Sequence, residues 1–377
     1  MFIAWILFMQ TTGHTEETDK RSWKEFLLNL FRLTAKPTVK VYHGYGHDNC
    51  LTVFGHVFKL SPYPRKKYRQ HFLRNTLALL RLFLIKPFAG ADVQLEWKGK
   101  QHNAKTDADG FFKFEWNDEE PFECGWFPVN VIASVNKKQI ASSTGRVYIP
   151  HTTQYVFISD IDDTFLISHS SNLRKRLWVL FTENARSRRP FEGVVRHYQL
   201  LAQSNTTEDA PNPFFYVSSS EWNLYEYILE FTAVNELPRG IFLLSQLKQF
   251  SQLLKTGQNN HGTKFTRIVR ILQAFPHQRV ILLGDSSQQD PYIYESIVQH
   301  YPKQVHAVYI RDVFQRNYEK VREVLNRIEA SGVACLLFKH SDEAILHSVK
   351  IGLIAPSDAE KKLSAAQNEI PKMAQSF

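Results

Sequence analysis

The sequence contains little cysteine and no closely spaced cysteine pair. Its three cysteines, Cys50, Cys124 and Cys335, are scattered over 377 residues. This odd and dispersed set argues against a disulfide framework and against a zinc site, whose ligands usually come in short-spaced pairs. A chain with these features fits a reducing compartment, and we expect a cytoplasmic protein.

Long apolar runs are also missing. No stretch reaches the roughly 20 uninterrupted apolar residues that a membrane helix requires. The first ten residues, MFIAWILFMQ, are apolar, but they are too short to span a bilayer and lack the basic start and cleavage site of a signal peptide. We therefore expect a soluble protein or one bound peripherally at the inner membrane face, with residues 1–36 as an N-terminal arm.

Acidic residues are outnumbered, at 37 against 46 lysines and arginines, so the formal net charge is +9. Such an excess favours anionic partners: phosphate esters, an acidic membrane surface or nucleic acid. Hydrophobic residues make up 43% of the chain, which is enough for a folded protein with a sizeable core. At about 150 residues per domain, the length predicts two domains.

Residues 37–150 consist of short β-rich runs separated by turn signals. LTVFGHVF at 51–58 is one such run, and Asp109-Gly110 is a suitable turn. We predict a small antiparallel β-sandwich domain here. One helical patch, residues 65–86, has seven basic residues and no acidic one. It fits either a helix lying on an anionic membrane or a covering helix whose charges are solvated.

Residues 151–350 alternate between apolar strands and amphipathic helices. Near-continuous apolar runs such as YVFIS and RVILL are typical of parallel strands covered on both faces. The helices between them carry apolar residues at three-to-four spacing, at 222–235, 264–275 and 292–301. The prediction is a doubly wound α/β domain with a parallel sheet, followed by a polar tail at 351–377.

Three predicted strands end in a polar residue of a chemically useful kind: Asp160, Ser218 and Asp285. The carboxyl ends of parallel strands open into the ligand crevice of such a sheet. We therefore expect these three side chains to converge there, although they are far apart in the sequence.

Asp160 begins the motif Asp-Ile-Asp-Asp-Thr, which ends at Thr164. The carboxylate of Asp160 is the predicted nucleophile, because an acyl phosphate would split one difficult displacement into two easier ones. Asp162 is predicted to protonate the leaving group and later to activate water, while Thr164 steadies the turn. The alternative is that this pentapeptide is a calcium-type loop or a simple turn.

Attack by one anion on another requires charge neutralisation, so we expect a divalent cation at this site. The predicted ligands are Asp160, the main chain of Asp162, and Asp285. An all-oxygen set favours Mg²⁺ over zinc. Asp290 is either a further residue on the metal side or the N-cap of a helix, because Pro291 follows it.

Ser218 precedes a predicted helix whose N-terminus can help to bind a phosphate oxygen. Lys264 opens the helix at 264–275 and can hold the phosphoryl group as a point charge, although a solvated lysine is the alternative. Ser219, Trp222 and Asn223 follow Ser218 and are predicted to contact the substrate. For Ser219 the alternative is capping of the next helix.

The order strand-DxDxT, strand-Ser, Lys, strand-GDxxxxD resembles the haloacid dehalogenase superfamily of phosphatases. More narrowly, the segments SDIDDT, FYVSSSEWNLYEYI and GDSSQQDPYIY are similar to the actin-patch-protein type of phosphatidate phosphatase. VYHGYG at 41–46 and TDADGFF at 106–112 are similar to the β-domain that precedes the catalytic domain in bacterial members. The resemblance covers residues 37–350.

The resemblance implies Mg²⁺-dependent hydrolysis of phosphatidate to diacylglycerol. It also implies a role for each site residue: nucleophile Asp160, acid and base Asp162, phosphate holders Ser218 and Lys264, and metal-side residues Asp285 and Asp290. Glu221 and Ser287 stand where the family commonly has proline and glycine, and both differences bear on substrate fit.

A phospholipid phosphatase working at an anionic membrane surface is the leading prediction. One alternative is a phosphatase of a soluble phosphoester, a phosphoprotein or a nucleic-acid end. Another is a non-catalytic module that binds membranes or nucleic acid. Nucleic acid is not the expected partner, because the aromatic residues fall in strands and helix cores instead of alternating with basic ones.

The basic segment between Arg174 and Arg189 is expected either to bind anionic headgroups or to form a solvated helix. The sequence leaves the oligomeric state open.

Overall fold

The computed structural model describes most of the chain, namely residues 28, 32–47, 49–62, 81–118, 122–161, 193–207, 209–247, 261–287 and 289–360. Several sequence predictions therefore lie outside the described residues. These are most of the N-terminal arm, the basic patch up to residue 80, the motif residues Asp162 and Thr164, the segment from Arg174 to Arg189, and the tail from residue 361. Within the described residues, no helix is long and apolar enough to cross a membrane.

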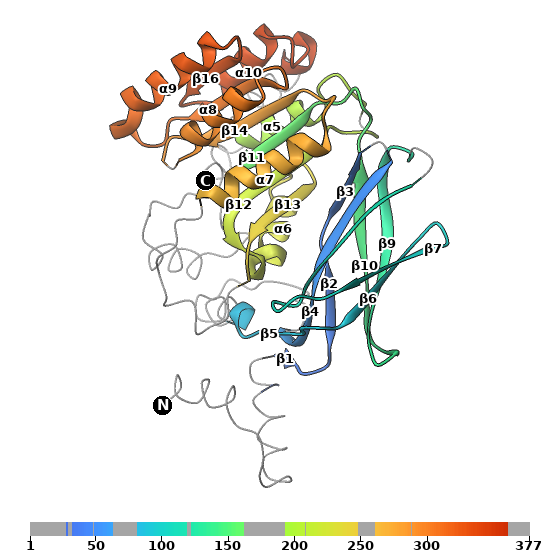
Figure 1. The fold of residues 1–377 in the computed structure, drawn as a ribbon. Coiled ribbons are helices and arrows are strands. Elements are labelled where there is room, and N and C mark those ends of the chain that lie inside the picture. The colour runs from blue at the N-terminus through green and yellow to red at the C-terminus, as the bar shows by residue number, and fades with distance from the viewer. Residues whose placement is uncertain are drawn as a thin grey trace, which may run out of the picture.

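The N-terminal part is built from strands, which hydrogen-bond into one network of ten (Figure 1). They are β1 (Leu33–Thr34), β2 (Thr38–Val41), β3 (Gly44–His47), β4 (Cys50–Pro62), β5 (Lys86–Pro87), β6 (Asp92–Trp97), β7 (Lys100–Lys105), β8 (Phe111–Asn117), β9 (Gly125–Val135) and β10 (Lys138–Ile149). Most pairs are antiparallel, but β3 and β10 pair in parallel. The predicted all-β character is confirmed, while the purely antiparallel pairing is wrong.

Alternation of side chains explains why these segments are strands. In β6, Val93, Leu95 and Trp97 are buried and the residues between them are more exposed, so the strand presents one apolar face. The turn before β8 is fixed by Asp107, whose carboxylate accepts the backbone N–H groups of Asp109 and Phe111, each at 2.9 Å. An aspartate in this position is a common turn former because its short side chain reaches its own backbone.

The helical prediction for residues 65–86 is wrong at its C-terminal end, the only part that the structure describes. Residues Arg81–Phe83 form a short 3₁₀ helix. Strand β5 then begins at Lys86 and pairs with β4. Tertiary pairing outweighs the local helical pattern at this point, because Phe83 and Ile85 are buried against the neighbouring elements.

The C-terminal part contains a second, six-stranded sheet in the order β13-β12-β11-β14-β15-β16. Every adjacent pair in it is parallel. The strands are β11 (Val156–Asp160), β12 (Phe214–Glu221), β13 (Gly240–Ser245), β14 (Val280–Asp285), β15 (Val305–Arg311) and β16 (Ala334–Phe338). The predicted α/β part with a parallel sheet is confirmed.

Helices connect these strands (Figure 1). They are α5 (Val194–Ala202), α6 (Tyr225–Val234), α7 (His261–Ala274), α8 (Asp290–His300), α9 (Tyr318–Ala330) and α10 (Ser341–Lys350). The chain moves outward from β11 through β12 to β13, and then returns to β14 on the other side of β11. This reversal of strand order beside β11 is where open parallel sheets form their ligand crevice.

Aromatic side chains join the two parts. Tyr42 of β-rich residues 32–149 stacks on Trp222 with ring centroids 4.1 Å apart, and it lies 4.4 Å from the ring of Tyr225. The Nδ1 atom of His43 lies 2.8 Å from the carbonyl oxygen of Gly240. One continuous hydrophobic core contains residues from both parts, so the two parts pack as one body.

Two buried histidines predict how stability depends on pH. Burial lowers the pKa of His56 and of His197 to about 3, whereas both titrate near 6.5 in the unfolded chain. Between pH 6.5 and 3 the unfolded state therefore binds more protons, so the free energy of unfolding falls as pH falls through this window. We expect a loss of about 2 kcal/mol per histidine between pH 6.5 and 5.

Chemical denaturation at a series of pH values measures this slope. His197→Gln should make the slope shallower by about one proton. Equal slopes for wild type and His197→Gln would contradict the assignment.

Candidate active site

Polar residues meet at the carboxyl end of the central strands. Asp160 is the last residue of β11 and Asp285 the last of β14, and these two strands are neighbours. On the other side of β11 lies β12, which carries Ser218. All three side chains are fully buried. The structure thus brings together the strand-end residues that the sequence singled out.

Lys264 and Asp290 complete the group from helices α7 and α8. The ammonium of Lys264 lies 2.8 Å from Oδ1 of Asp160 and donates to Oδ1 of Asp290. The helix-cap interpretation of Asp290 is wrong, because α8 begins at Asp290 and Gln289 holds the N-cap position. The solvated-lysine interpretation of Lys264 is wrong as well, since its side chain is buried.

Gly284 allows Asp290 to approach the end of β14. A Cβ atom at this position would lie 2.7 Å from Oδ2 of Asp290 and 2.9 Å from the ring of Tyr294. Any larger residue would push the carboxylate away from Asp285. The Tyr294 hydroxyl donates to the carbonyl of Leu283 at 2.9 Å, which fixes α8 against β14. Glycine therefore precedes Asp285 for a steric reason: there is no room for a side chain at position 284.

Opposite charges dominate the electrostatics of this group. Burial lowers the pKa of Lys264, but Asp160 and Asp290 outweigh this effect and raise that pKa above its usual range. Lys264 is therefore a permanent cation. Three carboxylates face one ammonium, so the cluster still favours additional positive charge.

The cluster fits a hard divalent cation. Asp160, Asp285 and Asp290 each offer a carboxylate oxygen, and these oxygens lie within 4.8 Å of one another. No other such group of three His, Cys, Asp or Glu side chains occurs in the part of the chain that the structure describes. Carboxylate oxygen without sulfur or imidazole is the ligand type that Mg²⁺ prefers.

The loop after β14 is held by Ser286, which the sequence did not single out. Its hydroxyl accepts the backbone N–H groups of Val313 at 3.0 Å and Phe314 at 3.1 Å. The N–H of Ser287 donates to Oδ1 of Asp285 at 2.6 Å. These bonds fix the loop to the end of β15 and thereby orient the Asp285 carboxylate. In the sequence, the only indication of this role is that Ser286 directly follows the site residue Asp285.

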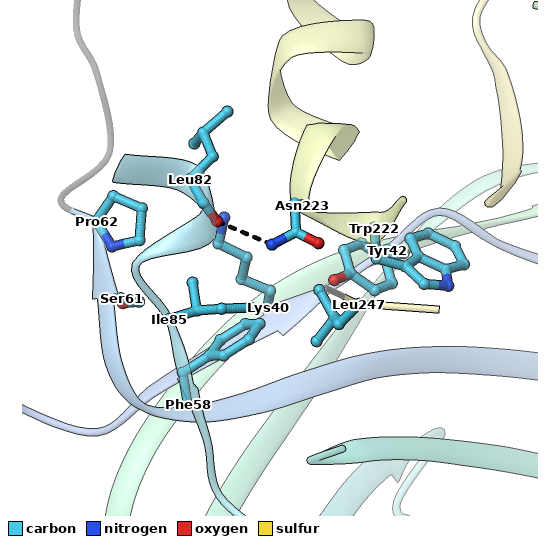
Figure 2. A pocket seen from close by; sticks show the side chains of 10 residues that line it. All are labelled: Lys40, Tyr42, Phe58, Ser61, Pro62, Leu82, Ile85, Trp222, Asn223 and Leu247. Carbon is cyan, nitrogen blue, oxygen red and sulfur yellow. Dashed lines mark hydrogen bonds between the residues drawn. The ribbon is translucent and has the colours of Figure 1, made fainter. Parts of the chain in front are cut away.

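Trp222 and Asn223, which the sequence predicted to contact substrate, lie between the two parts of the protein. Both line a small pocket together with Tyr42 and Leu82, and the side-chain amide of Asn223 donates to the Leu82 carbonyl at 3.0 Å (Figure 2). Ser219 lies in the irregular end of β12 between these residues and Ser218. Substrate contact remains a prediction for all three.

Comparison with known proteins concerns the segment that holds this cluster. Residues 155–312 match the family model described as phosphatidate phosphatase APP1, catalytic domain. This segment is similar to a phosphatidate phosphatase catalytic domain. It includes every described member of the cluster, from Asp160 to Asp290.

Two curated proteins are similar to this chain over part of their length. Phosphatidate phosphatase APP1 of Saccharomyces cerevisiae is 31% identical over 180 residues, which cover 46% of this chain and 29% of the yeast protein. The uncharacterized protein C29B5.04c of Schizosaccharomyces pombe is 22% identical over 262 residues, 66% of this chain and 41% of that protein. The chain thus spans less than half the length of these relatives.

Among solved structures, XAC1771, a carbohydrate acetylesterase from Xanthomonas citri, is 10% identical and covers 82% of this chain and 72% of that chain. Its TM-score of 0.29 is too low to indicate a shared fold.

Proposed function

We propose that this protein is a Mg²⁺-dependent phosphatase that hydrolyses phosphatidate to diacylglycerol and phosphate through an aspartyl phosphate on Asp160. The observation that carries the proposal is the buried cluster of Asp160, Asp285, Asp290 and Lys264. It lies in a segment similar to a phosphatidate phosphatase catalytic domain. A doubly wound, haloacid dehalogenase-like fold and a β-sandwich domain before it belong to the same proposal.

Asp160 is the nucleophile in this mechanism. One of its carboxylate oxygens forms a bond to phosphorus while the bond from phosphorus to the ester oxygen breaks, which leaves an acyl phosphate and an alkoxide. Lys264, 2.8 Å from Asp160, neutralises negative charge on the phosphoryl oxygens throughout the transfer. Its burial between two carboxylates keeps it protonated and in place.

Asp162 moves the protons, as the sequence predicts. It donates a proton to the leaving alkoxide and then accepts one from the water that attacks the acyl phosphate. Hydrolysis returns Asp160 to a carboxylate and releases inorganic phosphate. Ser218 donates a hydrogen bond to a phosphate oxygen from the end of β12.

Asp160, Asp285 and Asp290 would hold the Mg²⁺ ion. When bound, this ion supplies positive charge that offsets the repulsion between a carboxylate and a phosphate dianion. The hydrogen bond from the Ser287 N–H to Asp285 keeps one ligand oriented before the ion arrives. A cytoplasmic location with peripheral contact at an anionic membrane would bring the site to its lipid.

Phosphate release from a matched panel of substrates tests the proposal. We expect phosphatidate in vesicles to be hydrolysed with Mg²⁺, at least about tenfold faster than a soluble ester such as p-nitrophenyl phosphate, which corresponds to about 1.4 kcal/mol of activation free energy. Chelation of the metal should abolish both reactions.

A preference for the soluble ester would instead support a phosphatase of soluble substrates. Absence of Mg²⁺-dependent release from every ester would overturn the proposed function.

A further inference from the structure

Strand β12 is irregular at the residues that follow Val217. Val217 pairs with Leu243 of β13, and the next pair is Glu221 with Ser245. Residues 218–220 therefore lie opposite Leu244 alone. An insertion of this kind bends a strand and re-aims its side chains, and such bulges are frequent beside active sites.

Arg267 of α7 bridges the two strands at this bulge. Its Nη1 atom donates to the carbonyl oxygen of Ser218 at 3.0 Å, and its Nη2 atom donates to Oγ of Ser245 at 3.2 Å. A guanidinium suits this role because its N–H groups form a rigid planar fork. The same side chain therefore contacts the first residue of the bulge in β12 and the strand beside it.

The bulge also sets the direction of the Ser218 hydroxyl. The backbone N–H of Ser220 donates to Oγ of Ser218 at 2.9 Å, so the hydroxyl oxygen acts as an acceptor within the bulge. The position of that oxygen then depends on the backbone conformation of residues 218–220. Arg267 contacts this backbone at the Ser218 carbonyl.

Lys264 and Arg267 lie three residues apart on α7, and side chains at this spacing share one face of a helix. Lys264 contacts Asp160 at the end of β11, and Arg267 contacts the ends of β12 and β13. Helix α7 therefore presents two cations to the carboxyl edge of the sheet. The first belongs to the charged cluster and the second to the bulge.

We propose that Arg267 is a positioning residue that holds the β12 bulge so that the Ser218 hydroxyl faces the phosphate of the substrate. This inference rests on the proposed function, because it assumes that Ser218 binds a phosphate oxygen. If Arg267 has this role, the affinity of the protein for phosphate depends on Arg267, whereas its affinity for Mg²⁺ does not. Metal ligation belongs to the carboxylates on β11, β14 and α8.

The test compares Arg267→Met and Arg267→Lys with Arg270→Met in the full chain. Arg270 lies one turn further along the same helix and is exposed, so it is a matched control. Arg267→Met should weaken binding of inorganic phosphate, measured by calorimetry in Mg²⁺, by about tenfold and raise the KM for p-nitrophenyl phosphate similarly. Arg267→Lys should lose only about threefold, because a lysine can still reach one acceptor.

The Mg²⁺ concentration that gives half-maximal activity should not change in either variant. Equal phosphate affinity in Arg267→Met and Arg270→Met would overturn the inference, and so would a parallel loss of Mg²⁺ affinity. If Arg267→Met does not fold, the phosphate affinities of Arg267→Lys and Ser245→Ala are compared with that of wild type instead. Unchanged phosphate affinity in both variants would overturn the inference.

The outcomes also separate this inference from the proposed function. A wild-type protein that neither hydrolyses an ester nor binds phosphate would overturn both. An active wild type with unaffected Arg267 variants would overturn the positioning role alone.

Discussion

Asp160→Asn should lower Mg²⁺-dependent phosphate release by about 10⁴-fold or more, because the amide cannot form the acyl phosphate. The substitution keeps the size of the side chain. It also reduces the repulsion among three neighbouring buried carboxylates. We therefore expect the variant to fold. Hydrolysis of phosphatidate at saturating Mg²⁺ measures the rate, and circular dichroism checks the fold.

The covalent step provides a second readout for Asp160. Wild type quenched in acid during turnover of a labelled substrate should carry a phosphoryl label that hydroxylamine releases, and Asp160→Asn should carry none. Asp92 on β6 is an exposed aspartate, so Asp92→Asn serves as the control and should behave as wild type. If Asp160→Asn kept a tenth of the wild-type rate, Asp160 would not be the nucleophile.

Lys264→Met should destabilise the metal-depleted protein by about 3–5 kcal/mol, because it leaves buried carboxylates without their cation. Mg²⁺ should restore more stability to this variant than to wild type, because the ion would replace part of the missing charge. Denaturant titrations with Mg²⁺ and with a chelator measure both effects. The rate of phosphate release should also fall by about 10²–10³-fold.

Lys113 provides the contrast for Lys264. It pairs with Glu115 on an exposed strand surface, where an ion pair contributes at most about 1 kcal/mol. Lys113→Met should therefore leave the free energy of unfolding nearly unchanged. Equal denaturation midpoints for Lys264→Met and wild type without metal would show that the buried pair does not stabilise the fold.

The site residues at the ends of the strands could be predicted from the sequence. Asp160, Ser218 and Asp285 each follow a near-continuous apolar run, and the geometry of parallel sheets requires such strand ends to meet. The contact between Lys264 and Asp290 was not predictable, because the two residues lie on different helices and the geometry of a parallel sheet does not determine where helix residues meet. Only the packing of α7 against α8 brings them together.

Individual strands are hard to identify from the sequence where local patterns carry little information. Strand β7, KQHNAK, has no buried residue, and backbone pairing with β6 forms it. Strands β13 and β16 are short apolar runs, and periodicity alone does not distinguish such a run from a segment of a buried helix. Arg267 was missed for a similar reason, since nothing in the sequence marks which arginine of α7 faces a strand bulge.

The stacked pair of Tyr42 and Trp222 limits which fragments of the chain can keep the local structure around Trp222. Trp222 lies four residues after Ser218, and its ring stacks on that of Tyr42, which lies between β2 and β3. A fragment starting near His151 would leave this indole and the neighbouring Tyr225 ring facing water. The proposed phosphate contact of Ser218 would then lose the packing that these two rings provide. We therefore expect residues 32–149 to support the fold of the C-terminal part around Trp222.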